Sequence, residues 1–312
     1  MADKIATREA YGKALAEFGE VYENLVVLDA DLAAATKTGT FKKVFPERHF
    51  DCGIAENNMI CVATGMSLCG KIPFASTFAM FAAGRSFEQI RNSIGYPHNN
   101  VKIGATHAGI TVGEDGATHQ CCEDIALMRT IPGMVILNPA DAVEARLAVK
   151  AAIEYVGPVY LRFGRMAVPV LFGDDYKFEI GRGVKMADGT DVALIATGIE
   201  VEQALGAREL LAAEGISASV VNISTIKPLD EALVAAEAAK CGAVVTCEEH
   251  TVIGGLGGAV CECLAEKRPT PVLRVGIQDE FGRSGPAKEL LGYYHLDAAA
   301  IAEKAKAAIA LK

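Results

Sequence analysis

The chain has 312 residues, of which 51% are hydrophobic and 22% charged, so a disordered chain is excluded and about two domains are expected. Its formal net charge is −9, from 30 basic and 39 acidic residues, which leaves no basic excess to neutralise phosphates. We therefore expect neither a general nucleic-acid surface nor a surface that binds anionic membranes.

Targeting segments are not expected either. The longest uncharged stretch, residues 57–70, is shorter than the roughly 20 residues that span a bilayer. Residues 1–8 have no apolar core and do not indicate a signal peptide. The nine cysteines have irregular spacing and form no Cys-x-x-Cys pair, which is typical of reduced thiols in a cytoplasmic protein and not of a zinc site.

In the first half of the chain, short apolar runs alternate with alanine-rich amphipathic stretches. Strands are expected at 24–29, 101–105, 134–137 and 158–162. Apolar residues at three- and four-residue spacing predict helices at 8–22, 56–69, 78–93 and 140–155. Continuous apolar strands that alternate with helices indicate a parallel sheet covered on both faces.

The pattern weakens after Phe163, and residues 164–188 are richer in proline, glycine and charge, as in a connector. A second alternating unit follows, with strands expected at 191–196, 217–223, 242–247 and 271–275, and helices at 200–214 and 258–267. We therefore predict two α/β domains, residues 1–185 and 186–312, each a parallel or mixed sheet with helices on both faces.

The densest polar stretch is the glycine-rich segment 104–120, which follows a predicted strand. It contains His107, Glu114, Asp115 and His119. In open α/β sheets, ligands bind beyond the carboxyl ends of the strands, and histidines beside an acid suit proton transfer and hydroxyl recognition. The alternative is a glycine-rich surface loop whose polar residues are solvated.

Two further stretches allow a structural and a functional interpretation. Glu56 opens a predicted helix, where its carboxylate either stabilises the helix N-terminus or, if buried, shares a proton with a heterocyclic nitrogen. Phe78 and Phe81 lie one turn apart on a predicted helix, and they either fill the core or stack on a flat ring. The residue patterns alone leave both questions open.

Three arginines, Arg8, Arg162 and Arg165, lie near predicted strand ends or helix starts. Each either binds phosphate through paired donors or forms a solvated salt bridge. The glycine-rich turn at 248–258 lacks the spacing and the lysine of a P-loop, so tight packing of a helix on a strand is its expected use.

Taken in this order, the segments resemble the C-terminal half of transketolase over essentially the whole chain. Residues 106–120 are similar to the family loop Thr-His-Asp-Ser-Ile-Gly-x-Gly-Glu-Asp-Gly-Pro-Thr-His-Gln. Residues 53–59 resemble its glutamate motif, residues 76–81 its Ser-Thr-Phe-x-x-Phe motif and residues 30–32 its Ala-Asp-Leu turn. The resemblance favours the functional interpretation of four residues: Glu56, Phe81, Asp115 and His119.

The resemblance implies thiamine diphosphate chemistry at a site between two subunits or domains. In that family a preceding N-terminal domain holds the diphosphate and its divalent metal, Mg²⁺ or Ca²⁺. The Gly-Asp-Gly … Asn-Asn motif for these groups is not found, so no metal ligand is expected in this chain. The implied protein is the C-terminal subunit of a cytoplasmic split transketolase, completed by a separate N-terminal subunit as a dimer of heterodimers.

The family's cofactor-binding residues carry over to four positions. Glu56 would hydrogen-bond the pyrimidine nitrogen opposite the amino group and favour the form that takes up the thiazolium proton. Phe78 and Phe81 would line the pyrimidine pocket, with Phe81 the better stacking candidate. Asp31 would support the cofactor-binding turn.

The family's substrate-binding residues carry over to five positions. His119 would bind substrate oxygens at the reacting end, and Asp115 would bind a hydroxyl beside the reacting carbonyl. Arg8, His107 and Arg165 would face the sugar phosphate, and Arg165 matches the family's Arg-x-x-x-Pro pattern.

Several positions depart from the family pattern. Ala108 and Gly109 replace an Asp-Ser pair, Ala35 replaces a phosphate-binding serine, Gly84 replaces an aromatic residue and Cys121 replaces a proline. The loss of the serine hydroxyl at Ala35 is expected to weaken the affinity for phosphate.

Three different proteins compete with this interpretation. A 1-deoxyxylulose-5-phosphate synthase shares the Ala-Gly pair, but it begins its loop with Asp-Arg and has alanine in place of Glu114. The beta chain of a 2-oxo acid dehydrogenase shares the expected fold but lacks the Gly-Glu-Asp-Gly loop. A partner subunit without catalytic activity would be favoured by the loss of Glu56, which is present here.

Overall fold

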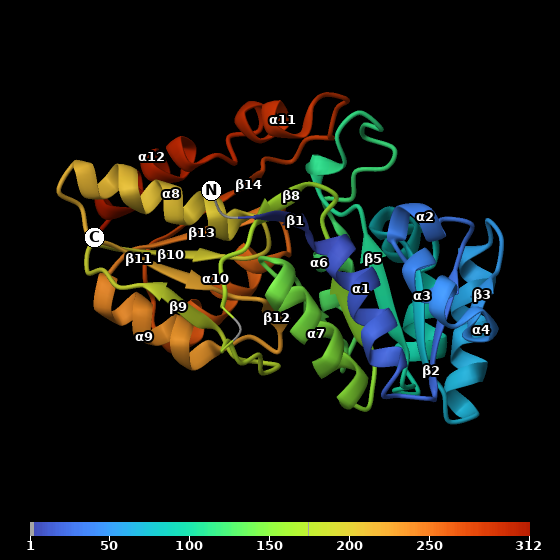
Figure 1. The fold of residues 1–312 in the computed structure, drawn as a ribbon. Coiled ribbons are helices and arrows are strands. Elements are labelled where there is room, and N and C mark those ends of the chain that lie inside the picture. The colour runs from blue at the N-terminus through green and yellow to red at the C-terminus, as the bar shows by residue number, and fades with distance from the viewer. Residues whose placement is uncertain (1–2, 174) are drawn as a thin grey trace.

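The structure is a computed structural model that describes residues 3–173 and 175–312. It contains a seven-stranded sheet, a five-stranded sheet and a two-stranded ribbon. Figure 1 shows the two large sheets beside each other, each with helices on both faces. The predicted α/β class, with parallel or mixed sheets, is confirmed.

The seven-stranded sheet has the order β12-β6-β7-β5-β4-β2-β3, and only the edge strand β12 is antiparallel to its neighbour. Its strands are β12 (Thr225–Lys227), β6 (Val135–Leu137), β7 (Val159–Arg162), β5 (Lys102–Thr106), β4 (Ile72–Phe78), β2 (Leu25–Asp29) and β3 (His49–Asp51). Because six neighbouring strands run parallel, their carboxyl ends meet at one edge of the sheet.

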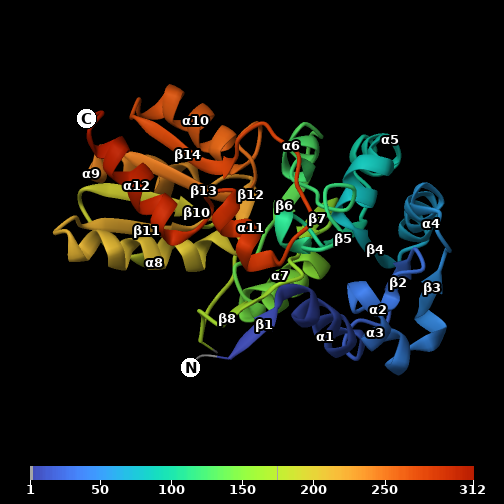
Figure 2. The same cartoon turned by 90° about the horizontal axis from the view of Figure 1, so that it is seen from above.

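Alternating side chains of the strands build a separate core on each face of this sheet. In β2, Leu25 and Val27 pack with α1 (Thr7–Gly19) and α7 (Ala142–Glu154), whereas Val26 and Leu28 pack with the opposite layer. That layer contains α4 (Glu56–Leu68), α6 (Asp124–Arg129) and the helical segment 80–95. Figure 2 separates the two layers, with α1 and α7 on one side of the sheet and α4, α5 and α6 on the other.

The helix predicted at 78–93 is wrong at its start. Residues 72–78 form β4, and the chain then continues through η2 (Met80–Arg85), α5 (Phe87–Gln89) and η3 (Ile90–Gly95), of which η2 and η3 are π-helical. β4 lies between β2 and β5 and is buried on both faces, but Pro73, Ser76 and Thr77 interrupt its apolar run, so its sequence does not show the strand. Phe78 therefore ends a strand.

The five-stranded sheet has the order β14-β13-β10-β11-β9, with only β9 antiparallel. Its strands are β14 (Val272–Ile277), β13 (Val244–Thr251), β10 (Val192–Ala196), β11 (Ala218–Asn222) and β9 (Val184–Ala187). One core includes α8 (Glu200–Ala213), α11 (Ala287–Tyr293) and α12 (Ala298–Ile309), and the other includes α9 (Glu231–Cys241) and α10 (Leu256–Lys267).

The two halves of the chain are joined by more than the connector. β12 comes from the second half and pairs with β6 of the first sheet. β8 (Ala167–Pro169), in the connector, pairs with β1 (Lys4–Ala6), so this part of the connector lies against the first half. The predicted boundary between residues 185 and 186 falls inside β9 and stays a prediction.

The sequence predicts reduced cysteines and no membrane-spanning segment. The nine cysteines, all within the described ranges, are free thiols. In the described part of the chain, no helix is both long enough and apolar enough to cross a membrane.

Candidate functional site

The candidate site lies at the carboxyl edge of the seven-stranded sheet, where segments after β2, β4 and β5 meet. Figure 1 shows the segment that follows β5 beside the segment that precedes α11. Two of its glycines lie close to that second segment, since an added Cβ at Gly113 would be 3.4 Å from Gly285 O and one at Gly116 would overlap Ser284 Oγ. The site is thus built from the first domain and bordered by the second.

Four rings from two segments gather at this edge. Phe78, at the end of β4, stacks on Phe81 with a centroid distance of 5.7 Å and an interplanar angle of 12°. The ring of His107 also stacks on Phe78, with a centroid distance of 3.8 Å. His119 meets Phe81 edge-on at 5.5 Å. The structure therefore brings these four predicted site residues together.

Glu56 is the first residue of α4, and its carboxylate is almost fully buried. Arg85 Nη1 donates to Glu56 Oε2 at 2.7 Å, and the same guanidinium lies 4.5 Å from the centroid of Phe81. Arg85 thus links the carboxylate to the aromatic pair. Sequence reasoning missed this residue, although a cation shortly after an aromatic pair is a usable signal for cation–π contact.

The turn after β2 is held by Asp29. Thr36 Oγ1 and Thr38 Oγ1 donate to Asp29 Oδ2 at 2.8 and 2.9 Å, and Leu32 N donates to Asp29 Oδ1. Burial raises the pKa of Asp29, and these hydrogen bonds oppose that shift. Sequence reasoning missed Asp29, whose signal was an acidic residue ending an apolar strand.

Asp31, the predicted residue of this turn, has an exposed side chain. Its backbone is left-handed, with φ of 60°, and its N–H donates to Asp51 Oδ1 at 3.1 Å. A non-glycine residue with this conformation stores strain and is a pointer to function. Its role toward the cofactor stays a prediction.

Arg8 and His107 form one unit. Arg8 Nη1 donates to Ala35 O at 3.0 Å and is 2.9 Å from His107 Nε2. Because a guanidinium only donates, Nε2 must accept and the proton lies on Nδ1, which donates to Thr106 Oγ1 at 2.9 Å. Burial, Arg8 and Arg165 together lower the pKa of His107 to about 3, so the ring is neutral at pH 7.

The cationic end of the site is suited to an anion. The buried Nε of Arg8 has no hydrogen-bond partner, and burial and the charge of Arg165 lower the pKa of Arg8. Arg165 Nη1 lies 3.5 Å from Glu114 Oε2 and 3.6 Å from Asp115 Oδ2. These acidic groups are exposed, so the pairs are weak and open to exchange with a ligand.

Arg162 does not join this cluster. It is buried, and its Nε donates to Asp124 Oδ2 at 2.9 Å. Its Nη2 donates to the carbonyl oxygen of Glu249 in the second domain at 2.9 Å. Arg162 is thus a buried link between domains, which is neither the phosphate contact nor the solvated salt bridge that its position in the sequence predicts.

An open cavity of about 780 Å³ borders Phe81 of the aromatic pair and is lined by both domains. Phe81, Arg85 and Thr118 line it from the first domain, and Thr251 and Phe281 line it from the second. A buried carboxylate, a stacked ring pair and an open cavity fit a flat heterocycle such as the pyrimidine that the resemblance implies. Within residues 3–173 and 175–312, no cluster of three or more His, Cys, Asp or Glu side chains could hold a metal ion.

We expect His107 to stay neutral between pH 8 and pH 5. Its folded pKa of about 3 lies below the unfolded value of 6.5, so the unfolded chain takes up the proton first as the pH falls. The stability that His107 contributes is therefore full above pH 6.5 and is lost between pH 6.5 and pH 3. An NMR titration of its Cε1–H tests this, and a shift change with a midpoint above about pH 5 would contradict it.

Two family profiles match the chain. The profile described as "Transketolase, pyrimidine binding domain" matches residues 3–170, and "Transketolase, C-terminal domain" matches residues 181–301. Together they cover both sheets. The resemblance seen in the sequence motifs is confirmed.

Individual relatives agree with these profiles. A Methanocaldococcus jannaschii protein, provisionally designated a transketolase C-terminal section, is 52% identical over 300 residues, which are 95% of this chain and 94% of that protein. A 6-deoxy-6-sulfo-D-fructose transketolase subunit of a Clostridium species is 43% identical over 278 residues, 89% of this chain and 86% of that subunit. A solved structure described as a split gene transketolase, inactive beta4 tetramer, has a TM-score of 0.93 at 54% identity and covers 99% of both chains. On this sequence and fold similarity, the chain belongs to the transketolase family.

Proposed function

We propose that this chain is the C-terminal subunit of a split transketolase, which transfers a two-carbon ketol unit from a ketose phosphate to an aldose phosphate. The observation that carries the proposal is Glu56, buried at the start of α4 and linked through Arg85 to the stacked pair Phe78 and Phe81. A buried carboxylate beside a ring-stacking surface is what proton exchange with a heterocyclic nitrogen requires.

Thiamine diphosphate, when bound, supplies the carbon nucleophile for this transfer. Glu56 would hydrogen-bond the pyrimidine nitrogen and hold a proton there, and Phe81 and Phe78 would cover the ring. In the chain alone, Arg85 donates a hydrogen bond to Glu56 Oε2. When the pyrimidine ring binds, Arg85 would share that oxygen with the ring or give up the hydrogen bond. These residues bind and orient, and they exclude water from the carboxylate.

The cationic cluster would hold the anionic end of the sugar. Arg8 offers the unpaired Nε, Arg165 offers a partly exposed guanidinium, and neutral His107 fixes the orientation of Arg8. Asp115 would accept a hydrogen bond from the hydroxyl beside the reacting carbonyl, and His119 would bind oxygens at the reacting end. The relative that acts on a sulfonated sugar supports an anionic ketose as the substrate class.

The missing parts of the site define the partner. We place the diphosphate and its Mg²⁺ or Ca²⁺ on a separate N-terminal subunit, in a cytoplasmic dimer of heterodimers. The inactive tetramer of a similar split transketolase chain supports a subunit that needs completion.

The purified chain is expected to bind thiamine diphosphate weakly and to show no ketol transfer. Mixing it with the N-terminal subunit, the cofactor and Mg²⁺ should create activity with ketose and aldose phosphates. The measurement is a coupled assay of product formation for each subunit alone and for the mixture. Full turnover by this chain alone would contradict the half-enzyme proposal, and formation of 1-deoxyxylulose 5-phosphate from pyruvate would favour the synthase instead.

A further inference from the structure

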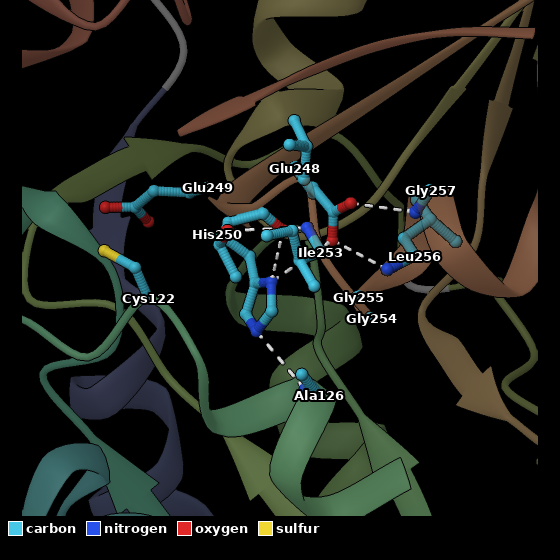
Figure 3. Close-up of polar contacts among 12 residues, drawn as sticks. Cys122, Ala126, Glu248, Glu249, His250, Ile253, Gly254, Gly255, Leu256 and Gly257 are labelled. Carbon is cyan, nitrogen blue, oxygen red and sulfur yellow. Dashed lines mark hydrogen bonds and ion pairs between the residues drawn. The ribbon is translucent and has the colours of Figure 1, made fainter. Parts of the chain in front are cut away.

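Three consecutive buried polar residues, Glu248, Glu249 and His250, lie near the carboxyl end of β13 in the second domain. Side chains alternate along a strand, so the middle residue faces away from its two neighbours. Figure 3 shows this arrangement, with Glu249 directed toward the side of Cys122 and the other two directed elsewhere. Each of the three reaches a different segment of the chain.

The outer two residues cap helices. Glu248 accepts from Leu256 N at 2.7 Å and from Gly257 N at 2.8 Å, which are the first amides of α10. This geometry confirms helix–strand packing as the use of the glycine-rich turn at 248–258. His250 Nε2 accepts from Ala126 N in α6 at 3.3 Å, and its Nδ1 donates to Thr251 O at 2.7 Å.

Glu249 reaches the loop of the first domain that carries the predicted substrate residues. Its buried Oε1 accepts from Thr111 N at 2.6 Å. The loop can come this close because residue 109 is glycine, since a Cβ added to Gly109 would overlap Glu249 Cδ. Gly109 also has a φ of 78°, a conformation that favours glycine. Gly109, where the family has serine, is therefore the residue that lies against the Glu249 carboxylate of the second domain.

The backbone that carries Glu249 is fixed as well. Arg162, which is held by Asp124, donates from Nη2 to Glu249 O at 2.9 Å. Further along the loop, Gln120 Nε2 donates to Arg283 O of the second domain at 2.9 Å. The loop between these anchors, residues 112–119, contains Asp115 and His119.

We propose that Glu249 is a positioning residue, which holds the loop at Thr111 and thereby places Asp115 and His119 toward the sugar. This gives the C-terminal domain a part in substrate binding in addition to assembly. The substrate part of the proposal rests on the proposed transketolase function, whereas the anchoring of the loop does not. Glu56, Phe78 and Phe81 lie on other segments, so loss of Glu249 should weaken sugar binding more than cofactor binding.

The anchoring is tested by amide hydrogen exchange of the purified chain. Glu249→Leu fills the space but removes the acceptor, and exchange of residues 109–113 should accelerate about 10- to 150-fold, the range for loss of a hydrogen bond to a charged group. Glu249→Gln has nearly the same shape and keeps an oxygen that can accept from Thr111 N. It should restore most of the protection. If Glu249→Leu does not fold, Glu249→Asp serves instead. It keeps the carboxyl group, is one methylene shorter and should also give faster exchange of residues 109–113.

Glu248→Leu is the matched control, because Glu248 is equally buried on the same strand but caps a helix of its own domain. It should accelerate exchange at the start of α10 and leave residues 109–113 at the parent rate. The proposal is overturned if the Glu249 variants leave residues 109–113 protected. It is also overturned if both glutamate variants accelerate exchange in both segments equally, since that result means general loosening.

In the protein assembled with its N-terminal subunit, Glu249→Leu should raise KM for the ketose phosphate about 10-fold or more. The dissociation constant of thiamine diphosphate should rise by a clearly smaller factor than KM, and Glu249→Gln should recover most of the KM. Equal weakening of sugar and cofactor would overturn the positioning role. Absence of ketol transfer in the parent assembly would instead overturn the proposed function and leave the exchange result standing.

Discussion

Replacement of Glu56 by alanine in the assembled protein is expected to slow exchange of the cofactor's thiazolium proton by about 10²–10⁴-fold, the range for loss of a positioned proton-transfer group. The carboxylate is 2% exposed, so water does not replace it freely. The measurement is the rate of hydrogen–deuterium exchange at the thiazolium carbon, followed by quenched-flow NMR with saturating cofactor.

The fold should survive this change. Arg85, the partner that loses its carboxylate, has a side chain that is 46% exposed, so its charge is solvated after the substitution. Loss of an acidic residue in the first turn of α4 should cost about 0.3–1 kcal/mol through the helix dipole. A control is Asn57→Ala on the same turn, which removes the bond from Ser86 Oγ to Asn57 Oδ1 and should leave proton exchange unchanged. If the thiazolium proton exchanges at the parent rate in Glu56→Ala, then Glu56 only stabilises the N-terminus of α4 and takes no part in proton transfer.

The sequence was sufficient to predict the parts of the fold that depend on local pattern. The helix predicted from Glu56 begins at that residue. The strands predicted at 101–105 and 242–247 begin one and two residues before β5 and β13. β4 was missed because Pro73, Ser76 and Thr77 interrupt its apolar run, so it shows neither the continuous apolar run of the other buried strands nor a two-residue alternation. Short strands such as β3 were missed because three residues carry too little periodicity.

The sequence also predicted only part of the candidate site. The carboxyl ends of the parallel strands β4 and β5 meet at one sheet edge, which brings Phe78 close to His107, but a prediction without β4 could not place Phe78 there. The neutral state of His107 could not be predicted either, since it depends on burial and on Arg8, a residue 99 positions away. Glu249 was missed because its contact joins segments that no local pattern relates, and the same holds for the hydrogen bond from Arg85 to Glu56.

Asp115 is the residue that we expect to discriminate between donor substrates. Asp115→Ala should lower kcat/KM for ketose phosphates by about 10- to 150-fold, because a hydrogen bond to a charged group contributes roughly 1.5–3 kcal/mol. It should hardly affect hydroxypyruvate, which has no hydroxyl at that position. The measurement is the ratio of the two catalytic efficiencies in parent and variant, with cofactor saturating.

Glu114→Ala is the matched control for this prediction. Glu114 and Asp115 lie 3.5 and 3.6 Å from the same nitrogen of Arg165, so either substitution removes one ion pair from that guanidinium. Exposed pairs of this kind contribute about 0–1 kcal/mol, and Glu114→Ala should therefore change both efficiencies by less than about fivefold. A large loss confined to ketose phosphates in Asp115→Ala then reports the sugar hydroxyl and not the charge of Arg165. Equal losses on both substrates would mean that Asp115 shapes the loop or the cofactor site and does not contact the sugar.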